Sequence, residues 1–252
     1  IVVNTAKVPN LEHRKAIAAA MDRAQLRTIA GGEYAGDLAD GVIKPNLPAD
    51  YAPSGMWETL LGAPIPDTGD PEYAKKLIAD SGEALPTLQY DYPQTPTNDK
   101  GAAALVASLG KAGIKVKPNP IEAGQFYAIV FDPDKEGHLV AAGWGPDWSN
   151  ASTVIPELFT PSGGFNLSQA DDKEFNAKVE EARAETDRDA QAEMWKELNK
   201  EAMANVWVVP TRFGREQRLA GSKVKSASGD NGNVYIWAPY GSWPYGDLYV
   251  EQ

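Results

Sequence analysis

The chain has 252 residues, 35 acidic and 24 basic side chains, a formal net charge of −11 and no cysteine. A net negative surface repels phosphate backbones and anionic lipids, which argues against nucleic-acid and membrane-surface binding, and the lack of cysteine excludes disulfides, thiol nucleophiles and thiolate metal sites. A hydrophobic content of 42% is enough for a sizeable core, and the length allows one large domain or two small ones.

The first part of the chain predicts alternating strands and helices. A strand at 1–4 precedes a helix that begins at Asn10, a good N-cap residue, and a short helix at 25–29 ends at a glycine pair. The Pro- and Gly-rich residues 32–70 are expected to form an ordered loop layer. Further elements are expected as helices at 70–82, 98–112 and 124–130 and as strands at 85–92, 114–116 and 138–144. This alternation predicts a layered α/β domain.

The second part of the chain is mainly helical and then changes in character. A short helix is expected at 153–159, followed by helices at 171–184 and 186–204 and a buried strand at 206–209 that Pro210 closes. The next stretch carries five basic side chains and a single acidic one, Glu216. A Ser/Gly/Asn-rich stretch and an aromatic tail that runs to Tyr249 follow it.

The sequence lacks most of the residue patterns that mark catalytic and metal-binding sites. The only histidines, His13 and His138, are not at metal-ligand spacing, and the nucleophile-elbow pattern Gly-x-Ser-x-Gly does not occur. We therefore expect neither a metal nor another cofactor. The one enzymatic hypothesis is an acid/base glycoside hydrolase that uses Asp147 and Glu157 as its carboxylate pair.

The most informative segment is 142–150, where a buried strand ends in a Gly/Pro turn between Trp144 and Trp148. Ligands of α/β proteins bind at strand ends, and Asp147 in an aromatic setting can hold an ammonium group by charge-assisted hydrogen bonds. In the other interpretation, Asp147 caps the following turn while both tryptophans fill the core. The spacing alone does not decide between them.

Four stretches carry a resemblance to a known family. They are Asn4 with Arg14–Ile17 and Ala20–Arg23; Asp70–Ile78 through Gly82 with Leu109–Ile114; Gly143-Trp144 with Asp147; and Asn166, Phe175, Asp187, Met194-Trp195 and Val209-Pro210. Together they cover about residues 1 to 213. The chain resembles the C-terminal half of the family 5 extracellular solute-binding proteins, which are the oligopeptide- and dipeptide-binding components of ABC importers.

The resemblance implies a type II periplasmic-binding-protein fold, α/β with a mixed sheet flanked by helices. Residues 1–213 would form the C-terminal, ligand-binding lobe, and residues 214–252 are expected to return to another lobe that this sequence does not include. The implied function is that of a monomeric, non-enzymatic receptor. It would capture peptides or a related small solute outside the cytoplasmic membrane and deliver them to an ABC permease.

The resemblance also implies a site. Asp147 stands where peptide-binding members hold the α-ammonium of the peptide, while the tryptophans would wall the pocket. The Gly145-Pro146 turn departs from the family pattern, and some members bind sugars or nickel complexes, so an oligosaccharide is the alternative ligand. The expected ligand-binding residues are Asp147, Trp144, Trp148, Phe126, Tyr127 and Asn166.

The sequence begins at Ile1 and not at Met, which suggests a fragment. The resemblance implies an upstream export signal and, in Gram-positive bacteria, a lipid-anchored cysteine. We therefore expect an extracytoplasmic protein, either periplasmic or anchored at the cell surface. Because half of the cleft would be missing, we also expect weak or no ligand binding by these residues alone.

Overall fold

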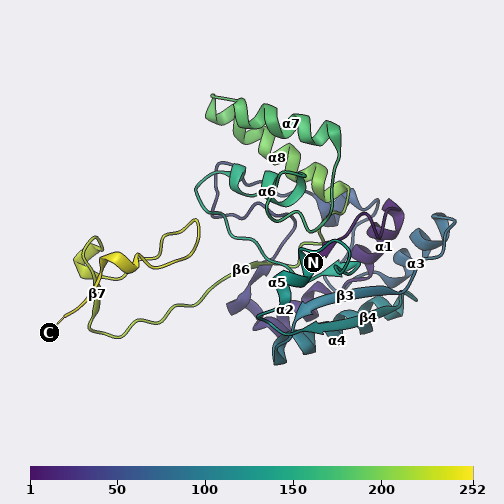
Figure 1. Cartoon of the computed structure of the whole chain (residues 1–252), viewed down its shortest axis with the longest axis horizontal. Coiled ribbons are helices and arrows are strands. Elements are labelled where there is room, and N and C mark those ends of the chain that lie inside the picture. The colour runs from purple at the N-terminus through teal and green to yellow at the C-terminus, as the bar shows by residue number, and fades with distance from the viewer. Residues whose placement is uncertain (252) are drawn as a thin grey trace.

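A four-stranded mixed sheet organises the part of the chain that the computed structural model describes, residues 1–251 (Figure 1). The strand order is β1-β5-β3-β4, and β3 runs parallel to both of its neighbours while β1 runs antiparallel to β5. The bounds are Val2–Val3 for β1, Leu88–Pro93 for β3, Val116–Ile121 for β4 and Leu139–Val140 for β5. The predicted α/β fold with a mixed sheet is confirmed.

Two strands differ from the sequence-based expectation. The strand predicted at 114–116 lies instead at Val116–Ile121, a segment that contains Pro118 and Pro120. β4 pairs only with β3, and an edge strand tolerates proline because one side of it needs no N–H donors. The strand predicted at 138–144 is reduced to the two residues of β5, after which the Ala141 N–H donates once more to Asp91 O at 2.8 Å before the chain turns away.

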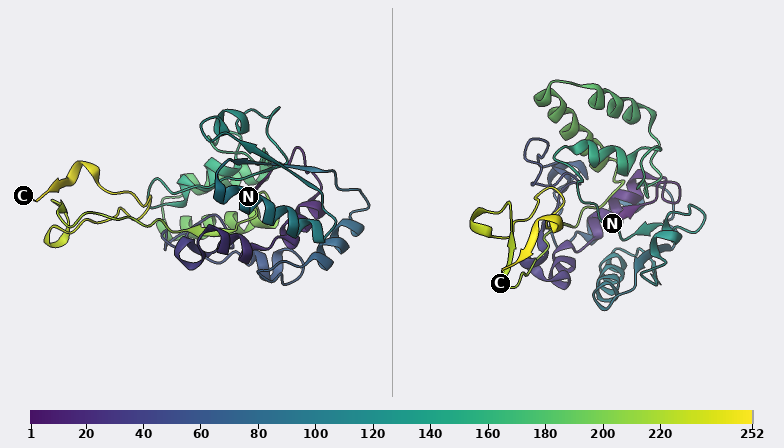
Figure 2. Two further views of the ribbon diagram at one scale, coloured as in Figure 1. Left: turned by 90° about the horizontal axis from the view of Figure 1, so that it is seen from below. Right: turned by 60° about the vertical axis from the view of Figure 1, so that its left-hand side comes forward.

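Helices from the first half of the chain pack against this sheet. Asn10, Asp70 and Thr95 cap α1, α3 and α4 through side-chain oxygens that accept backbone N–H groups. α4 packs on β3 and β4 and contacts α1, α2 and α3, and the left view of Figure 2 shows the purple and blue helices below the strands. The bounds are Leu11–Ala20 for α1, Arg23–Ala30 for α2, Pro71–Asp80 for α3, Pro96–Lys111 for α4 and Phe126–Val130 for α5.

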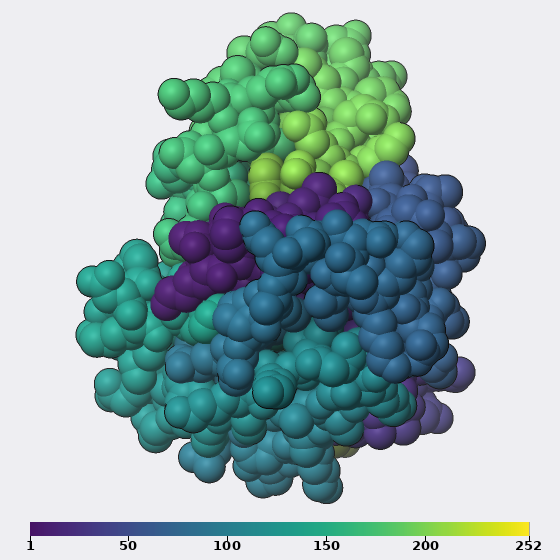
Figure 3. Space-filling model, turned by 90° about the vertical axis from the view of Figure 1, so that its right-hand side faces the viewer, coloured from purple at the N-terminus to yellow at the C-terminus, as the bar shows by residue number. Residues whose placement is uncertain are grey.

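Three helices follow the sheet in the chain: α6 (Ile155–Phe159), α7 (Lys173–Ala184) and α8 (Arg188–Ala204). Figure 3 shows the green α7 and α8 as a distinct mass above the purple N-terminal segment. Phe175 and Trp195 are fully buried between these helices and the rest of the core. The predicted helix starts at 171 and 186 are each wrong, because Asp172 and Asp187 are the residues whose carboxylates accept the first N–H groups.

Residues 32–70 form the ordered loop layer that the sequence predicted. A 3₁₀ turn (Gly32–Ala35) leads into β2 (Gly36–Leu38), which pairs antiparallel with β6 (Arg212–Gly214). A π-helical turn (Met56–Leu60) follows, and it buries Met56 and Trp57 in the main core. The layer is therefore held by its own side chains and by a strand contact from the end of the chain.

The buried strand predicted at 206–209 is only partly correct. Val206 has a left-handed φ of 49°, which interrupts extended geometry at the first position. Beyond it, Val208 forms a single bridge with Val2, the Val3 N–H donates to Trp207 O, and the Val209 N–H donates to Ile1 O. The segment thus lies beside β1 as an extended stretch without becoming a full strand.

Beyond β6 the chain leaves the body and projects from it (Figures 1 and 2). The projecting segment, residues 215–251, carries the hairpin of β7 (Val224–Ser226) and β8 (Leu248–Val250) and exposes Trp237, Tyr240 and Tyr245. It touches the loop layer where Asn46 Nδ2 donates to Ala238 O at 2.9 Å.

Within residues 1–251, none of the helices combines the length and the apolar character that a bilayer span requires.

Candidate functional site

The ends of the central strands open into a cleft whose floor is Gly143 and Arg212. Three adjoining hollows share these two residues, and we call them together the strand-end cleft. A hollow of about 640 Å³ lies on the side of β6 and Tyr240, and one of about 380 Å³ lies on the side of α2 and Tyr127. A narrow hollow of about 100 Å³ beside Trp144 joins them. This position, beyond the carboxyl ends of β3 and β5, is where α/β folds place ligands.

An aromatic wall runs along the cleft. The ring centroids of Trp144 and Phe165 are 5.0 Å apart, Phe165 lies 5.7 Å from Tyr127, and Tyr127 lies 5.2 Å from Phe126. Phe131 stacks on Tyr127 at 5.6 Å. The structure thus brings together the predicted Trp144, Phe126 and Tyr127, and the ring that connects them is Phe165, which sequence reasoning missed.

Asp147 is exposed beside this wall, and Thr153 orients it. The Thr153 hydroxyl donates to Asp147 Oδ2 at 2.9 Å, the Asp147 N–H donates to Thr153 Oγ1 at 3.1 Å, and Thr153 O accepts from Trp144 Nε1 at 2.7 Å. No residue from 1 to 251 donates a hydrogen bond to the other carboxylate oxygen, Oδ1. Asp147 therefore presents one free oxygen at the edge of the cleft, although the lining of the hollows extends only to Gly145.

The interpretation in which Asp147 caps the next turn is wrong. Asn150 is the N-cap, since its side chain accepts from Ser152 N. Trp148 does not fill the core either, because half of it (50%) is exposed and its Nε1 donates to Ser152 Oγ at 3.0 Å. Within residues 1–251, Trp148 is in no aromatic pair with the rings of the wall, so Trp144 and Trp148 do not form a pair.

Asn166 follows Phe165 of the wall in the chain and closes its own loop. Its Nδ2 donates to Thr160 O at 3.1 Å and to Ala170 O at 2.8 Å, while its Oδ1 accepts from the Ser168 hydroxyl at 2.8 Å. Glu157, the second carboxylate of the hydrolase hypothesis, likewise serves a loop, because its Oε2 accepts from Gly164 N at 2.9 Å.

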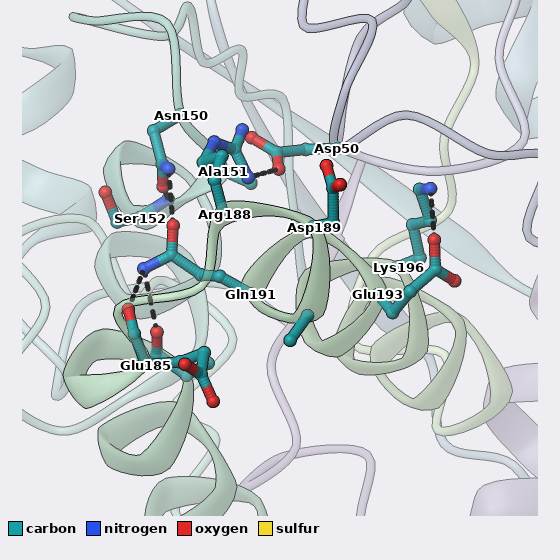
Figure 4. Close-up of polar contacts among 12 residues, drawn as sticks. Asp50, Asn150, Ala151, Ser152, Glu185, Arg188, Asp189, Gln191, Glu193 and Lys196 are labelled. Carbon is teal, nitrogen blue, oxygen red and sulfur yellow. Dashed lines mark hydrogen bonds and ion pairs between the residues drawn. The ribbon is translucent and has the colours of Figure 1, made fainter.

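A polar network behind the site fixes the loop that carries Asp147 (Figure 4). Asp50 is fully buried, and its Oδ2 accepts from Ala151 N at 2.8 Å. Arg188 Nη1 lies 2.7 Å from Asp50 Oδ1, an ion-pair contact without the alignment of a hydrogen bond. Asn150 Nδ2 donates to Gln191 Oε1 at 2.8 Å. The start of α8 and the loop layer therefore hold the turn from both sides.

Charged side chains also line the cleft. Lys44 and Arg212 border both the hollow of about 640 Å³ and the narrow one beside Trp144. Burial lowers the pKa of Lys44, Glu216 raises it, and the like charge of Arg212 lowers it again. The sequence indicated a basic segment from 212 onward, but no local signal marked Lys44.

A separate buried polar cluster lies behind the sheet, away from the cleft. Glu136 is fully buried, and its Oε2 accepts from Asn4 Nδ2 at 3.0 Å and Gln169 Nε2 at 3.1 Å. Asp91, also fully buried, accepts from Gly137 N at 2.6 Å and Asn119 Nδ2 at 2.8 Å. Burial raises the pKa of Glu136 to about 7, and the nearby Asp91 contributes in the same direction. The cluster joins the first residues of the chain to the turn before β5.

Two further hollows lie outside the strand-end cleft. One of about 560 Å³ lies between side chains of α7 and α8. Most of the residues that line it are charged, and Met194 and Leu198 also line it. The other, of about 750 Å³, surrounds Arg23 and Trp57. No ligand-binding residue predicted from the sequence lines either of them, and no group of three or more His, Asp or Glu side chains in the described part of the chain has the arrangement of a metal site.

Comparison with known proteins identifies the family of this chain. Residues 1–166 match the profile described as bacterial extracellular solute-binding proteins, family 5 Middle. The heme-binding protein A of Haemophilus influenzae is 27% identical over 213 residues, which are 78% of this chain and 36% of that protein.

Solved structures share the fold. The clavulanic acid biosynthesis oligopeptide binding protein 2 superposes with a TM-score of 0.80 at 23% identity, over 100% of this chain and 46% of the other. A dipeptide binding protein from Pseudoalteromonas sp. SM9913 in complex with Met-Leu gives a TM-score of 0.79 at 19% identity, over 99% of this chain and 47% of the other. The chain thus spans less than half the length of each of these proteins.

Proposed function

The chain belongs to the bacterial extracellular solute-binding proteins of family 5, and we propose that it supplies the ligand-binding part of a peptide receptor for an ABC importer. The observation that carries the proposal is the strand-end cleft, where the aromatic wall of Trp144, Phe165 and Tyr127 stands beside the oriented carboxylate of Asp147. The oligopeptide- and dipeptide-binding proteins that share the fold support the same ligand class.

Asp147 is the proposed anchor for the peptide α-ammonium. Thr153 holds one carboxylate oxygen, which leaves Oδ1 to accept from an ammonium group without a reorientation of the side chain. A charge-assisted hydrogen bond next to Trp144 and its aromatic neighbours is stronger than one in bulk water. Trp148, Phe126, Tyr127 and Asn166 stay in the proposed site. Of these, Tyr127 and Phe126 line the cleft, whereas Asn166 acts through its loop.

The oligomeric state, the location and the partner of the receptor are proposed from its family membership. The receptor is proposed to act as a monomer outside the cytoplasmic membrane and to deliver its ligand to a membrane permease. Residues 214–252, of which the structure describes all but the last, are proposed to contact a second lobe. The support is that the projecting segment leaves its aromatic side chains exposed in the described part of the chain.

Calorimetry with peptides tests the proposal on the full-length gene product. A tripeptide should bind to the native protein, and Asp147→Ala should weaken its binding by about 30-fold or more. The bound peptide would cover the exposed carboxylate, and truncating one partner of such a desolvated charge pair costs about 2–5 kcal/mol. N-acetylation of the peptide should produce a similar loss in the native protein and little further loss in the variant. Asp134→Ala, in an exposed acidic turn, is the matched control. An unchanged dissociation constant in Asp147→Ala would remove the anchor role.

Haem is a second ligand class to be tested, because one relative is a heme-binding protein. Neither histidine lines the strand-end cleft: His13 Nε2 bonds to Ser81 Oγ at 2.9 Å, and His138 Nδ1 accepts from Gln89 N at 3.1 Å. Histidine is a common axial ligand of haem, and neither histidine is placed to serve as one in this cleft. A titration with hemin, followed by the Soret band, and a thermal-shift screen with oligosaccharides test the two competing classes.

A further inference from the structure

The hollow of about 380 Å³ extends from the floor of the strand-end cleft to α2 and α4, which pack against each other (Figure 1). We call this hollow the α2–α4 crevice. Leu26 and Ile29 of α2 and Phe126 of α5 give it apolar sides, and Tyr90 of β3 and Gly101 of α4 also line it. Leu26 and Ile29 are only partly buried, so they have apolar surface left to cover with a ligand.

Gly101 leaves room in this crevice at a cost to its helix. It lies inside α4, where a glycine is less favourable than an alanine. Gly101 has no positive φ, and a Cβ atom on it would meet nothing within 4 Å beyond its own stretch of helix. Neither the backbone conformation nor close packing among the described residues therefore requires a glycine here. The open space beside Gly101 is space that a ligand side chain can fill.

Tyr90 adds an unpartnered polar group to the lining. It is only 7% exposed, and its hydroxyl makes no hydrogen bond within residues 1–251. Its ring stacks on Tyr92 with centroids 5.4 Å apart, whereas the Tyr92 hydroxyl donates to Asp99 Oδ1 at 3.1 Å. Burial raises the pKa of Tyr90, so the hydroxyl keeps its proton and can donate. Buried tyrosine hydroxyls usually have a partner, and a ligand group in the crevice would supply one.

The charges around the crevice disfavour a basic ligand side chain. Arg27 and Arg212 border it, and no acidic side chain of the described residues does. A lysine or arginine of a ligand would lie beside like charges and without a carboxylate partner. An aromatic ring suits the crevice better, because it packs on Leu26, Ile29 and Phe126 and its π face attracts a guanidinium group.

We propose that the α2–α4 crevice is a specificity pocket that takes an aromatic side chain of the bound peptide, and that the Tyr90 hydroxyl recognises a hydroxyl group on that ring. The inference rests on the proposed function and specifies it: the preferred ligands are peptides that contain phenylalanine or, with higher affinity, tyrosine. Gly101 provides the room for the ring, and Leu26, Ile29 and Phe126 provide its apolar contacts.

Calorimetry on the full-length gene product tests the pocket. The ligands are Ala-Ala-Ala and tripeptides in which Phe, Tyr, Lys or Glu replaces the alanine at one of the three positions. At one position, Phe should bind about tenfold or more tightly than Ala, because a large apolar side chain is buried. Tyr should bind about threefold more tightly than Phe there, because it gains a hydrogen bond. Lys should bind no more tightly than Ala at that position.

Two substitutions assign the preference to named residues. Gly101→Leu should remove the advantage of Phe and Tyr and leave the binding of Ala-Ala-Ala unchanged, since the new side chain occupies the crevice. Gly110→Leu is the matched control: Gly110 is exposed in the same helix, its Cβ would also meet nothing within 4 Å, and it borders none of the hollows described above. Tyr90→Phe should keep the advantage of Phe and lose only the additional advantage of Tyr. Urea denaturation checks that each variant is folded.

Several outcomes overturn the inference while peptide binding stands. They are equal affinities for Phe, Tyr and Ala at every position, a preference for Glu over Phe, and an aromatic preference that survives Gly101→Leu. Loss of Ala-Ala-Ala binding in folded Gly101→Leu also contradicts it, because the crevice would then hold the peptide main chain. If no tripeptide of the set binds to the native protein, the proposed function fails and the pocket fails with it.

Discussion

Replacing Glu136 by glutamine should make the stability of this protein less dependent on pH. Glu136 is fully buried, and its Oε2 accepts from Asn4 and Gln169, while Oε1 has no hydrogen-bond partner within residues 1–251. Lys7 Nζ donates to the Glu136 carbonyl oxygen, and the Asp91 carboxylate lies nearby. A glutamine keeps an acceptor for the two donors and can place its NH₂ group where the carboxylate has an unsatisfied oxygen.

The size and the sign follow from the raised pKa. Burial, with a smaller contribution from Asp91, raises the pKa of Glu136 from 4.5 to about 7. Between these values the folded state holds a proton that the unfolded state has released, so the free energy of unfolding falls as the pH rises through this window. Since a tenfold change in proton affinity is worth about 1.4 kcal/mol, the loss is complete above pH 7 and amounts to about 3 kcal/mol.

Urea denaturation of the native protein and of Glu136→Gln, at intervals from pH 5 to pH 8, measures this effect. The two proteins should be similar in stability near pH 5, and the variant should be more stable by about 2–3 kcal/mol at pH 8. His138, whose pKa burial lowers, titrates in both proteins and cancels in the difference. Asp134→Asn should run parallel to the native protein. Parallel curves for Glu136→Gln as well would refute the assignment of the titration to Glu136.

Two further predictions concern the framework of the site and of the core. Asp50→Ala leaves Ala151 N without its acceptor and Arg188 without its partner, so the free energy of unfolding should fall by about 2–3 kcal/mol and peptide affinity should fall with it. Urea denaturation and calorimetry measure both, with Asp189→Ala as control, and unchanged affinity would show that the network does not support the site. Arg14→Met removes the donor to three backbone carbonyls at 2.7–3.0 Å and should cost about 3 kcal/mol in urea, whereas an unchanged midpoint would contradict this.

Local signals accounted for most helix positions. The Asp70-Pro71 pair marks the start of α3 because its capping carboxylate and its fixed φ act within the first turn itself. At α8, Thr186 and Asp187 are adjacent and both can cap, so the sequence does not distinguish them, and Asp187 proved to be the cap. β4 was placed wrongly because prolines argue against strands, and only the sheet order reveals that this strand lies at an edge.

Phe126 and Tyr127 were expected from the family resemblance, whereas the residue pattern alone predicted the candidate site only where its residues lie close in the chain. Trp144 and Asp147 are three positions apart, and a strand end followed by a Gly/Pro turn identified both. Phe165 joins the wall to Tyr127 through long-range packing, which the periodicity of the sequence does not encode. Lys44 was missed for the same reason, since it borders the cleft from the loop layer, and that layer meets β6 through the long-range pairing of β2 with β6.

Thr153 has a consequence for how the receptor could adapt to different ligands. Its carbonyl oxygen accepts from Trp144 and its hydroxyl donates to Asp147, so the wall and the anchor are tied to one buried residue. A substitution of Thr153 would therefore disturb the wall and the anchor together. Relatives could change the peptides they accept by altering the loop layer and β6 while leaving the Trp144 turn intact.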